Sequence, residues 1–401
     1  MNSKKIMVIA GGDWQIELVR KAKKMGFYVV CSNLYEDSPA FPFADACEVA
    51  DVLDKEKNLQ IAKKYQPDAV ISDQSDIAVP TVAYVNEKLN LRGIGIAKAE
   101  LFTDKAKMRD FCKQNGILVP DYKLCETQSD AIEMLNKYKK IIIKPVDSQS
   151  SRGVFTIESE EDLAMHIEET ISYSNKSNQF LAEQYVEGEE FTVDGIVVDG
   201  KHYPLCISIK EMYEKNPNIS RMQTYSNQHE KYDYQQLRRV NKHLIETAAL
   251  PFGLTHSEYK YWNGEYYLIE AGARGGGSNL SAKIVPFISG IDNYEYLINS
   301  YLGENVDTEE LEKLSYPNNK FVIMRFFDFE EGKVKKVYGR EVLDECENMI
   351  DYQLNVDEGD VLQNPKYGRL RPGHFIIGGD DLNALEQQTI DILNAVRIEY
   401  E

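Results

Sequence analysis

The sequence predicts a mixed fold: an α/β amino-terminal domain, a central α+β part in two subdomains, and a small β-rich carboxy-terminal domain. In residues 1–103, short apolar runs alternate with amphipathic stretches of helical length, which is typical of a parallel sheet covered by helices. In residues 321–401, strand-like runs precede a single helical stretch. With 401 residues and 43% hydrophobic content, the chain can bury a large core and should form roughly two to four domains.

Composition argues against several classes of protein. The formal net charge of −19 argues against a nucleic-acid partner, because such binding requires clustered lysines and arginines. No apolar run reaches the roughly 20 residues that span a bilayer, and the amino-terminal stretch MNSKKIMVIAGG lacks the apolar region of a secretory signal. The 6 cysteines form no C-x-x-C pair, so neither a zinc site nor a disulfide framework is expected. We therefore expect a cytoplasmic protein without membrane contact.

The amino-terminal region, residues 1–103, is expected to have Rossmann-like topology. Strands are expected in KIMVIAGG, FYVVCSN, ACEVADV and DAVISDQSD, and helices over residues 13–25, 54–65 and 77–90. Gly11 and Gly12 open a strand-to-helix turn, but the full G-x-G-x-x-G fingerprint is absent, so no dinucleotide site is expected there. The loop 72–76 follows a strand, where α/β sheets bind ligands, but capping of the next helix by Asp76 explains it equally well.

The central part is expected to divide into two subdomains, residues 104–190 and residues 191–305. Residues 104–190 contain a helix ending at Gly116, a helix over 129–138 and a β-branched strand ending in Lys144. Residues 191–305 contain further strands and a helix near 233–249. The polar segment 303–320 lacks strand or core character and is expected to connect to the carboxy-terminal domain, 318–401, in which one helix covers about 382–394.

A lysine at the end of an apolar strand is unusual. The run IIIKP ends in Lys144-Pro145, although ionised lysine is rarely buried without a partner. The loop after it, residues 147–153, contains Ser148, Ser151 and Gly153 and is suited to presenting backbone N–H groups to phosphate oxygens. It is not the Walker motif. A surface hairpin whose lysine reaches solvent is the competing explanation.

Two glutamates flank an apolar position in the run AEQYVEGEE. Glu183 and Glu190 lie on either side of Val186. Main-chain groups on a flat apolar strand read adenine well, and a carboxylate accepts hydrogen bonds from ribose hydroxyls. An acidic surface turn is the competing explanation.

Two further glutamates flank a hairpin signal. The Asn263-Gly264 pair between alternating apolar runs predicts a tight turn, which would place Glu258 opposite Glu270 on the same side of the ladder. Like charges directly opposite each other are destabilising unless a cation lies between them. Magnesium, which prefers carboxylate and phosphate oxygens, meets that demand, and a pair of salt bridges is the alternative.

The run LIEAGARGGGSN places a guanidinium beside this pair. Arg274 lies four positions after Glu270, among glycines at 272 and 275–277. An arginine fork beside a magnesium site can bind a transferring phosphoryl group, and the glycines allow the backbone to approach a ligand. The run therefore predicts a site for the phosphates of a nucleotide.

In this order, the motifs resemble those of the ATP-grasp superfamily over nearly the whole chain. The layout is similar to that of biotin carboxylase, the carbamoyl-phosphate synthetase large subunit, carboxyaminoimidazole ribonucleotide synthetase and bacterial L-amino acid ligases. The resemblance implies a pre-ATP-grasp domain at 1–103, a small lid subdomain at 104–190, a large subdomain with the metal site at 191–305 and a carboxy-terminal domain at 318–401.

The resemblance also implies roles for individual residues. Lys105 and Lys144 would contact nucleotide phosphates, and 147–153 would be a mobile loop over the triphosphate. The adenine would be framed by Glu183, Gln184 and Val186, and the ribose would be bound by Glu190. Glu258 and Glu270 would hold Mg²⁺, with Mn²⁺ as an alternative, and Arg274 would stabilise the reacting acyl-phosphate.

The chain departs from the superfamily pattern in two places. The usual Glu-x-Asn-x-Arg is Glu270-Ala-Gly-Ala-Arg274, so that magnesium would keep an additional water or bind less tightly. The loop 147–153 is serine-rich where biotin carboxylase has a run of glycines, which weakens the likeness to carboxylases.

The resemblance implies an ATP-dependent carboxylate–amine ligase that forms an acyl-phosphate and joins it to an amine. The alternatives are a carboxylase that activates bicarbonate and a non-catalytic nucleotide-binding protein. The substrates would be small molecules, and relatives of this kind are often homodimers. Candidate substrate contacts are the 72–76 loop, Arg221 and His256, although a structural role explains His256 better. The carboxy-terminal domain would either cover the active site or form a dimer surface.

Overall fold

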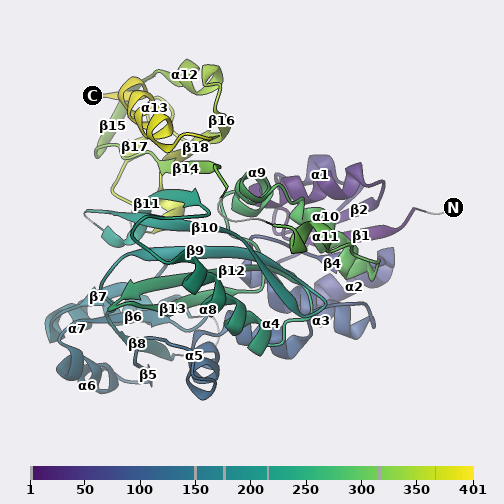
Figure 1. The fold of residues 1–401 in the computed structure, drawn as a ribbon, viewed down its shortest axis with the longest axis horizontal. Helices are drawn as coiled ribbons and strands as arrows, with labels where there is room; N and C mark the ends of the chain where they lie inside the picture. Colours follow the sequence, from purple (N-terminus) through teal and green to yellow (C-terminus); the bar gives the residue numbers. More distant parts are fainter. Residues whose placement is uncertain (1–2, 149–150, 175–177, 215, 315–317, 366) are drawn as a thin grey trace.

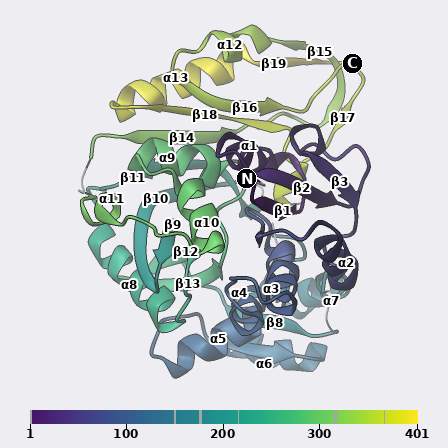
Figure 2. The same cartoon turned by 90° about the vertical axis from the view of Figure 1, so that its right-hand side faces the viewer.

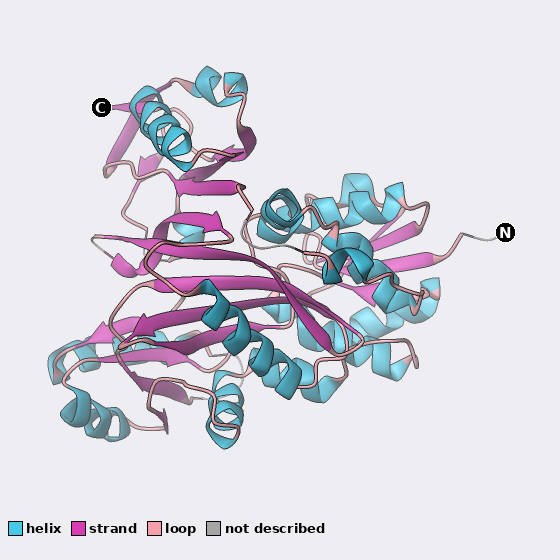
Figure 3. Cartoon of the chain, in the orientation of Figure 1, coloured by secondary structure: helices cyan, strands magenta, loops and turns pink. Residues whose placement is uncertain are grey.

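The structure, a computed structural model, describes residues 3–401 except 149–150, 175–177, 215, 315–317 and 366. Helices and strands occur in every region of the chain (Figure 3), which confirms the predicted mixed class. In the described part of the chain, no helix combines the length and apolar character needed to cross a membrane.

A parallel four-stranded sheet forms the amino-terminal region, in the order β3-β2-β1-β4. Its strands are β1 (Lys5–Ile9), β2 (Tyr28–Asn33), β3 (Ala46–Val49) and β4 (Ala69–Ile71). Its helices are α1 (Ile16–Lys24), α2 (Lys55–Tyr65), α3 (Val79–Lys88) and α4 (Ile96–Thr103), with short turns η1 (Asp13–Gln15), η2 (Phe41–Phe43) and η3 (Asp76–Ala78). Because β1 and β4 are parallel neighbours, the loops after them lie at the same edge, where the Gln15 side chain donates to the Asp73 carbonyl at 2.6 Å.

An antiparallel four-stranded sheet follows, in the order β5-β8-β6-β7. Its strands are β5 (Tyr122–Cys125), β6 (Ile141–Pro145), β7 (Phe155–Ile157) and β8 (Phe180–Gln184), and the helices of this region are α5 (Lys105–Gln114), α6 (Gln128–Tyr138) and α7 (Glu160–Ser172). Capping boxes begin α6 at Thr127 and α7 at Ser159. Side chains of α6 and α7 pack against the sheet in a core of their own, which includes Leu135, Leu163 and Phe180.

The largest sheet has eight strands, in the order β13-β12-β9-β10-β11-β14-β18-β16. The strands are β9 (Glu190–Val198), β10 (Lys201–Tyr213), β11 (Asn216–Ser226), β12 (Gly253–Trp262), β13 (Glu265–Gly272), β14 (Phe321–Phe326), β16 (Met349–Leu354) and β18 (Gly373–Gly379). The helices along it are α8 (Tyr234–Thr247), the π-helical η4 (Leu280–Ile284), α9 (Val285–Ser289) and α10 (Asn293–Leu302). Strands β14, β16 and β18 come from the carboxy-terminal region, which therefore continues the central sheet.

The rest of the carboxy-terminal region lies at one end of the molecule, beyond β14 and β18 (Figures 1 and 2). It contains β15 (Gly332–Tyr338), β17 (Val361–Leu362) and β19 (Arg397–Tyr400) and the helices α12 (Arg340–Glu345) and α13 (Leu382–Ala395). The turn η5 (Gly368–Leu370) lies instead near β11, because Arg371 donates to the carbonyls of both Gly368 and Ser220. The segment expected to be a plain connector contains α11 (Glu309–Glu312) instead, because Leu311 is buried against the large core.

Polar and apolar residues alternate along the inner strands of the large sheet. On β9, Glu190, Thr192 and Asp194 alternate with Phe191 and Val193, which are fully buried. Since successive side chains of a strand point to opposite faces, one face is polar and the other belongs to the core. The polar face carries the site described below.

We expect Phe191→Ala to destabilise the protein strongly. The Phe191 ring is fully buried and makes edge-on contacts with Tyr232 and Tyr266, with centroids 4.9 and 5.6 Å away. Its removal should lower the free energy of unfolding by about 3–5 kcal/mol, measured by urea denaturation. Leu124→Ala, at a side chain that is 41% exposed, should change it by less than about 0.5 kcal/mol. Equal losses in both variants would contradict this assignment of the core.

Candidate active site

A cavity of about 590 Å³ lies where the three regions of the chain meet. The amino-terminal loops supply Gln74–Ile77, the central sheet supplies Glu190, Lys210, His256, Glu258, Glu270 and Arg274, and the carboxy-terminal region supplies Gln353, Asn355, Arg371 and His374. A second cavity of about 260 Å³ shares Asp76, Ile77 and Glu270 with it. The carboxy-terminal region therefore forms part of the wall of this site.

The two glutamates of the hairpin face each other, although the tight turn from which this was predicted does not by itself place them opposite. Asn263 and Gly264 both have positive φ, 52° and 88°, as a tight type I′ turn requires. Glu258 pairs with Glu270, whereas Tyr259 pairs with Leu268, so Ile269 is an extra residue in β13. This bulge sets the register, because without it Glu258 would lie opposite Ile269.

Each of these carboxylates has a lysine partner. Lys105 Nζ lies 2.9 Å from Glu270 Oε1, and Lys210 Nζ lies 2.8 Å from Glu258 Oε1. Burial alone would raise the pKa of Glu258, but the Lys210 charge and His256 hold it well below its usual range. In this structure the two glutamates therefore form salt bridges with Lys105 and Lys210, as the alternative to a metal site expected. The described residues include no cluster of three or more His, Cys, Asp or Glu side chains suited to a metal. The metal assignment stays a prediction.

Lys210 connects two of the predicted site residues. Its Nζ lies 2.7 Å from Glu190 Oε1 as well as beside Glu258. Burial alone would lower the pKa of Lys210, but the two carboxylates raise it, so the lysine is charged. Sequence reasoning missed Lys210, although the alternation in CISIK places Ser208 and Lys210 on the same face.

Lys144 is buried in an ion-pair network. Its Nζ lies 2.7 Å from Glu183 Oε2, and Arg109 Nε lies 2.8 Å from Glu183 Oε1, with all three side chains at most 5% exposed. The snorkelling alternative for Lys144 and the surface-turn alternative for Glu183 are therefore wrong. Burial, together with the charges of Arg109 and Lys105, lowers the pKa of Lys144 to about 8. Arg109 was not predicted, yet it lies one helical turn after Lys105 on α5.

The loop after Lys144 is only partly described, since residues 149–150 of 147–153 lie outside the described part of the chain. The Ser148 carbonyl accepts from Lys105 Nζ at 2.6 Å, and the buried Ser148 Oγ has no hydrogen-bond partner within the described part of the chain. Ser151 lines the larger cavity. Gly153 has φ of 69°, and a Cβ there would come within 2.9 Å of the Tyr173 ring.

Not every predicted residue reaches these cavities. The larger one is lined by Ser151, Glu190, Glu258, Glu270 and Arg274, and the smaller one by Lys105, Ser148 and Glu270. Neither is lined by Lys144, Gly153, Glu183, Gln184 or Val186. The Gln184 N–H donates to the Asp121 carbonyl at 2.8 Å, and Val186 is buried. The residues expected to frame adenine thus lie apart from both cavities.

Arg274 is held by Asp76 from the amino-terminal region. Its Nε and Nη2 donate to Asp76 Oδ1 and Oδ2 at 2.9 and 2.7 Å, a bidentate pair. Asp76 is the first residue of η3, near the helix start as the capping alternative expected, but Ser75 holds the cap position and the Asp76 carboxylate pairs with Arg274. A Cβ on Gly272 would lie 3.1 Å from Asp76 Oδ1, so a larger residue at that position would crowd this pair. The absent asparagine therefore leaves room for Asp76.

The glycine-rich run after Arg274 is fixed to the same loop. The Asp73 carboxylate accepts from the Gly275 N–H at 2.6 Å and from the Tyr294 hydroxyl at 2.9 Å. The Gln74 side chain accepts from the Asn279 N–H at 3.0 Å. The 72–76 loop is thus a support for the site, a role that its position after a strand did not specify.

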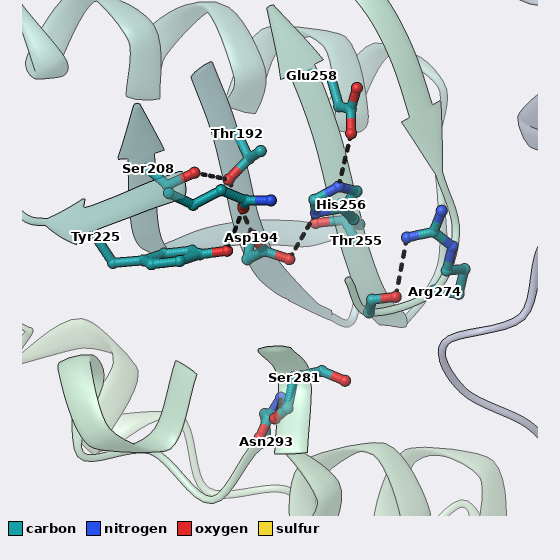
Figure 4. A network of polar contacts seen from close by, with 12 residues as sticks. Thr192, Asp194, Ser208, Tyr225, Thr255, His256, Glu258, Arg274, Ser281 and Asn293 are labelled. Atoms are coloured by element: carbon teal, nitrogen blue, oxygen red, sulfur yellow. Dashed lines mark hydrogen bonds and ion pairs between the residues drawn. The ribbon is translucent and has the colours of Figure 1, made fainter. Parts of the chain in front are cut away.

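His256 belongs to a chain of polar contacts on the sheet (Figure 4). Its Nδ1 lies 2.9 Å from Asp194 Oδ1 and its Nε2 lies 3.3 Å from Glu258 Oε1. Burial alone would lower the pKa of His256, but Asp194 and Glu258 raise it to about 9, so the ring is an imidazolium at pH 7. The ring lines the larger cavity. Arg221, in contrast, pairs with Glu211 at 3.3 Å and does not line it.

We expect Asp76 and Arg274 to be strongly coupled in stability. A double-mutant cycle of Asp76→Asn and Arg274→Gln should give a coupling free energy of about 1–3 kcal/mol, because the pair is largely shielded from water. The same cycle on the exposed pair Arg340 and Asp357 should give less than about 1 kcal/mol. Coupling of the first pair no larger than that of the second would refute the supporting role of Asp76.

Two family models match parts of this chain. Residues 138–282 match the ATP-grasp domain, and residues 325–401 match the L-amino acid ligase C-terminal domain 2. Among solved structures, the L-amino acid ligase from Bacillus licheniformis superposes with a TM-score of 0.82 over 100% of both chains at 20% identity. The phosphoribosylglycinamide synthetase from Anaerococcus prevotii superposes with a TM-score of 0.74 over 100% of both chains at 18% identity. These superpositions show a shared fold.

Sequence relatives cover shorter stretches. The alanine–anticapsin ligase of Bacillus subtilis (strain 168) is 26% identical over 269 residues, which are 61% of this chain and 56% of that protein. The formate-dependent phosphoribosylglycinamide formyltransferase of Maridesulfovibrio salexigens is 27% identical over 165 residues, 40% of this chain and 42% of that protein. The chain thus spans about half the length of the curated relatives it matches. By these matches, residues 138–282 are similar to the ATP-grasp domain and residues 325–401 to the carboxy-terminal domain of L-amino acid ligases.

Proposed function

We propose that the protein is an ATP-dependent carboxylate–amine ligase. It activates a small-molecule carboxylate as an acyl-phosphate, joins it to an amine and releases ADP and phosphate. The observation that carries this proposal is the pairing of Glu258 with Glu270 on a cavity wall that also presents Arg274 and Lys210. The names of the relatives, which include two amino acid ligases, support the same class of reaction.

The residues of the lid region serve the nucleotide in this proposal. Lys105 and Lys144 neutralise the phosphates, with Ser148, Ser151 and Gly153 in the loop that covers them. Glu183, Gln184 and Val186 frame the adenine, and Glu190 binds the ribose. Lys105 exchanges its contact with Glu270 for phosphate oxygens when ATP enters, since a lysine can pair with either anion.

The donor set fits a magnesium ion. Glu258 and Glu270 present oxygens from neighbouring strands, with side chains 23% and 35% exposed, so both are accessible from the cavity. When bound there, magnesium would neutralise the phosphate charge and complete its shell with phosphate oxygens and water. Gly272 offers no side chain to that shell.

The remaining chemistry is positioning and charge stabilisation. The substrate carboxylate attacks the γ-phosphorus, and an amine then displaces phosphate from the acyl group. Arg274 has N–H donors beyond those that Asp76 accepts, and these stabilise the oxyanion of the tetrahedral intermediate. Asp76 holds the guanidinium in place, which lowers the cost of ordering it during the reaction.

Glu270→Gln should abolish ATP-dependent phosphate release while leaving the fold intact. The change removes a charge and keeps the shape of the side chain, so we expect a loss of at least about 100-fold in kcat with circular dichroism unchanged. The assay is a phosphate-release screen with ATP, magnesium and pooled carboxylates and amines. Glu265→Gln, on the same strand but exposed, is the matched control and should retain activity.

The screen also separates the competing reactions. Phosphate release that needs bicarbonate, and no amine, would replace the ligase with a carboxylase. Normal turnover by Glu270→Gln would remove the metal assignment.

Nucleotide affinity should fall as pH rises through about 8. The pKa of Lys144 is lowered to about 8 by its burial, so its charge is complete near pH 6.5 and is lost above pH 8. Binding of a non-hydrolysable ATP analogue, measured by calorimetry from pH 6.5 to 9.5, should weaken about 10-fold over that range. Lys144→Met should bind weakly at all pH values and lose this dependence. If Lys144→Met kept the pH dependence of the wild-type protein, another group would be responsible for that dependence.

A further inference from the structure

The larger cavity contains a guanidinium that the proposed chemistry does not use. Arg371 lies between η5 and β18, and its Cζ is 3.3 Å from the centroid of the Phe326 ring. Its Nε donates to the Gly368 carbonyl at 2.7 Å, and its Nη1 donates to the Ser220 carbonyl at 2.9 Å. These contacts fix the guanidinium in one orientation and occupy two of its five N–H donors.

Arg371 differs from Arg109 and Arg274 because it has no carboxylate partner among the described residues. Arg109 pairs with Glu183 and Arg274 with Asp76, whereas no carboxylate within the described ranges forms an ion pair with Arg371. Its burial lowers the pKa of Arg371 to about 10, which still leaves it charged at pH 7. A buried charge without a partner costs free energy, which an anionic ligand would recover.

A second polar group on the same wall is unsatisfied. His374 is 6% exposed and lines the cavity, and its buried Nε2 has no hydrogen-bond partner among the residues that the structure describes. It pairs with Phe326 across β14 and β18, so this phenylalanine contacts both Arg371 and His374. Burial lowers the pKa of His374 to about 4 despite nearby Asp351, and the ring is neutral at pH 7. A neutral ring can donate from Nε2 to an anion.

This pair of residues lies away from the reacting end of the cavity. Glu258 and Glu270 are on β12 and β13 at one edge of the large sheet, whereas Phe326 and His374 are on β14 and β18. Strands β9, β10 and β11 separate the two groups. A ligand that reaches both must therefore carry its anionic group at a distance from the bond being formed.

We propose that Arg371 and His374 form a subsite for an anionic group of the substrate, a carboxylate or a phosphate remote from the reacting atoms. The proposal rests on the ligase function above and names its substrate class as one with a second acidic group. The guanidinium would bind two oxygens of that group with its free N–H donors, and His374 would donate to one of them.

Matched substrates test this subsite. The phosphate-release screen would compare L-glutamate with L-glutamine, L-aspartate with L-asparagine, and O-phospho-L-serine with L-serine as amines. The wild-type protein should prefer the acidic member of at least one pair, and Arg371→Gln should lose this preference by roughly 10- to 100-fold in kcat/KM, mostly through KM. Arg325→Gln is the matched control, because Arg325 also donates to the Arg221 carbonyl at 3.0 Å but does not line the cavity.

A binding measurement keeps the subsite testable without turnover. With labelled histidine, NMR signals of the 6 histidines would be followed while inorganic phosphate or glutarate is added at constant pH and ionic strength, with His374→Gln used to assign the ring. The His374 signal should shift and saturate with phosphate or with glutarate. The anion that causes the shift identifies whether the subsite prefers a phosphate or a carboxylate group. In Arg371→Gln the shift should vanish, and Arg371→Lys, which keeps the charge in case the first variant does not fold, should weaken it.

The outcomes distinguish the two proposals. Turnover that is indifferent to the second acidic group and to Arg371→Gln would overturn the subsite and leave the ligase. No turnover with any pool, but a His374 shift that depends on Arg371, would overturn the ligase and leave an anion site. No shift with either anion would overturn the subsite.

Discussion

Two carboxylates that face each other across a hairpin impose the constraint on which the site depends. Glu258 and Glu270 repel each other, so positive charge must be brought to both. The lysines come from separate parts of the fold, Lys105 from the start of α5 and Lys210 from β10. The amino-terminal region adds Asp76, which fixes Arg274 beside them. Charged groups from three regions of the sequence thus meet at this site, because the repulsion between the two carboxylates of one strand pair is offset only by cations from other elements.

The large sheet supports this concentration of charge by separating its faces. The rows Asp194 with His256, and Glu190 with Lys210, are direct cross-strand partners, so opposite charges pair along the hydrogen-bonding direction. Phe191, which lies between Glu190 and Asp194 on β9, points to the core and packs among tyrosines. The same strands that bury the core therefore present an ordered polar surface to the cavity.

Local signals in the sequence predicted much of this arrangement. The Asn263-Gly264 pair predicted the hairpin, and helical periodicity over 54–65 and 129–138 predicted helices that the structure places at Lys55–Tyr65 and Gln128–Tyr138. The bulge at Ile269, which gives Glu258 its partner, had no sequence signal of its own. Arg109 and Lys210 were missed, and Asp76 was named only as a cap and as part of the 72–76 loop, because their partners Glu183, Glu258 and Arg274 are distant in sequence and neither periodicity nor turn chemistry specifies such contacts. The alternation EFTVD was visible, and it would have pointed to Asp194.

The carboxy-terminal region is joined to the central sheet by main-chain hydrogen bonds, since β11 pairs with β14 and β14 with β18. The stability of this region therefore depends on the same sheet that contains the strands bearing Glu190 and Lys210. Replacing this whole segment with that of a homologue would disturb the pairing of β14 with β11, and any change in substrate selectivity would come with a loss of sheet structure. Diversification of such a molecule should accordingly proceed by replacing individual side chains on the cavity wall, with the strands left in place.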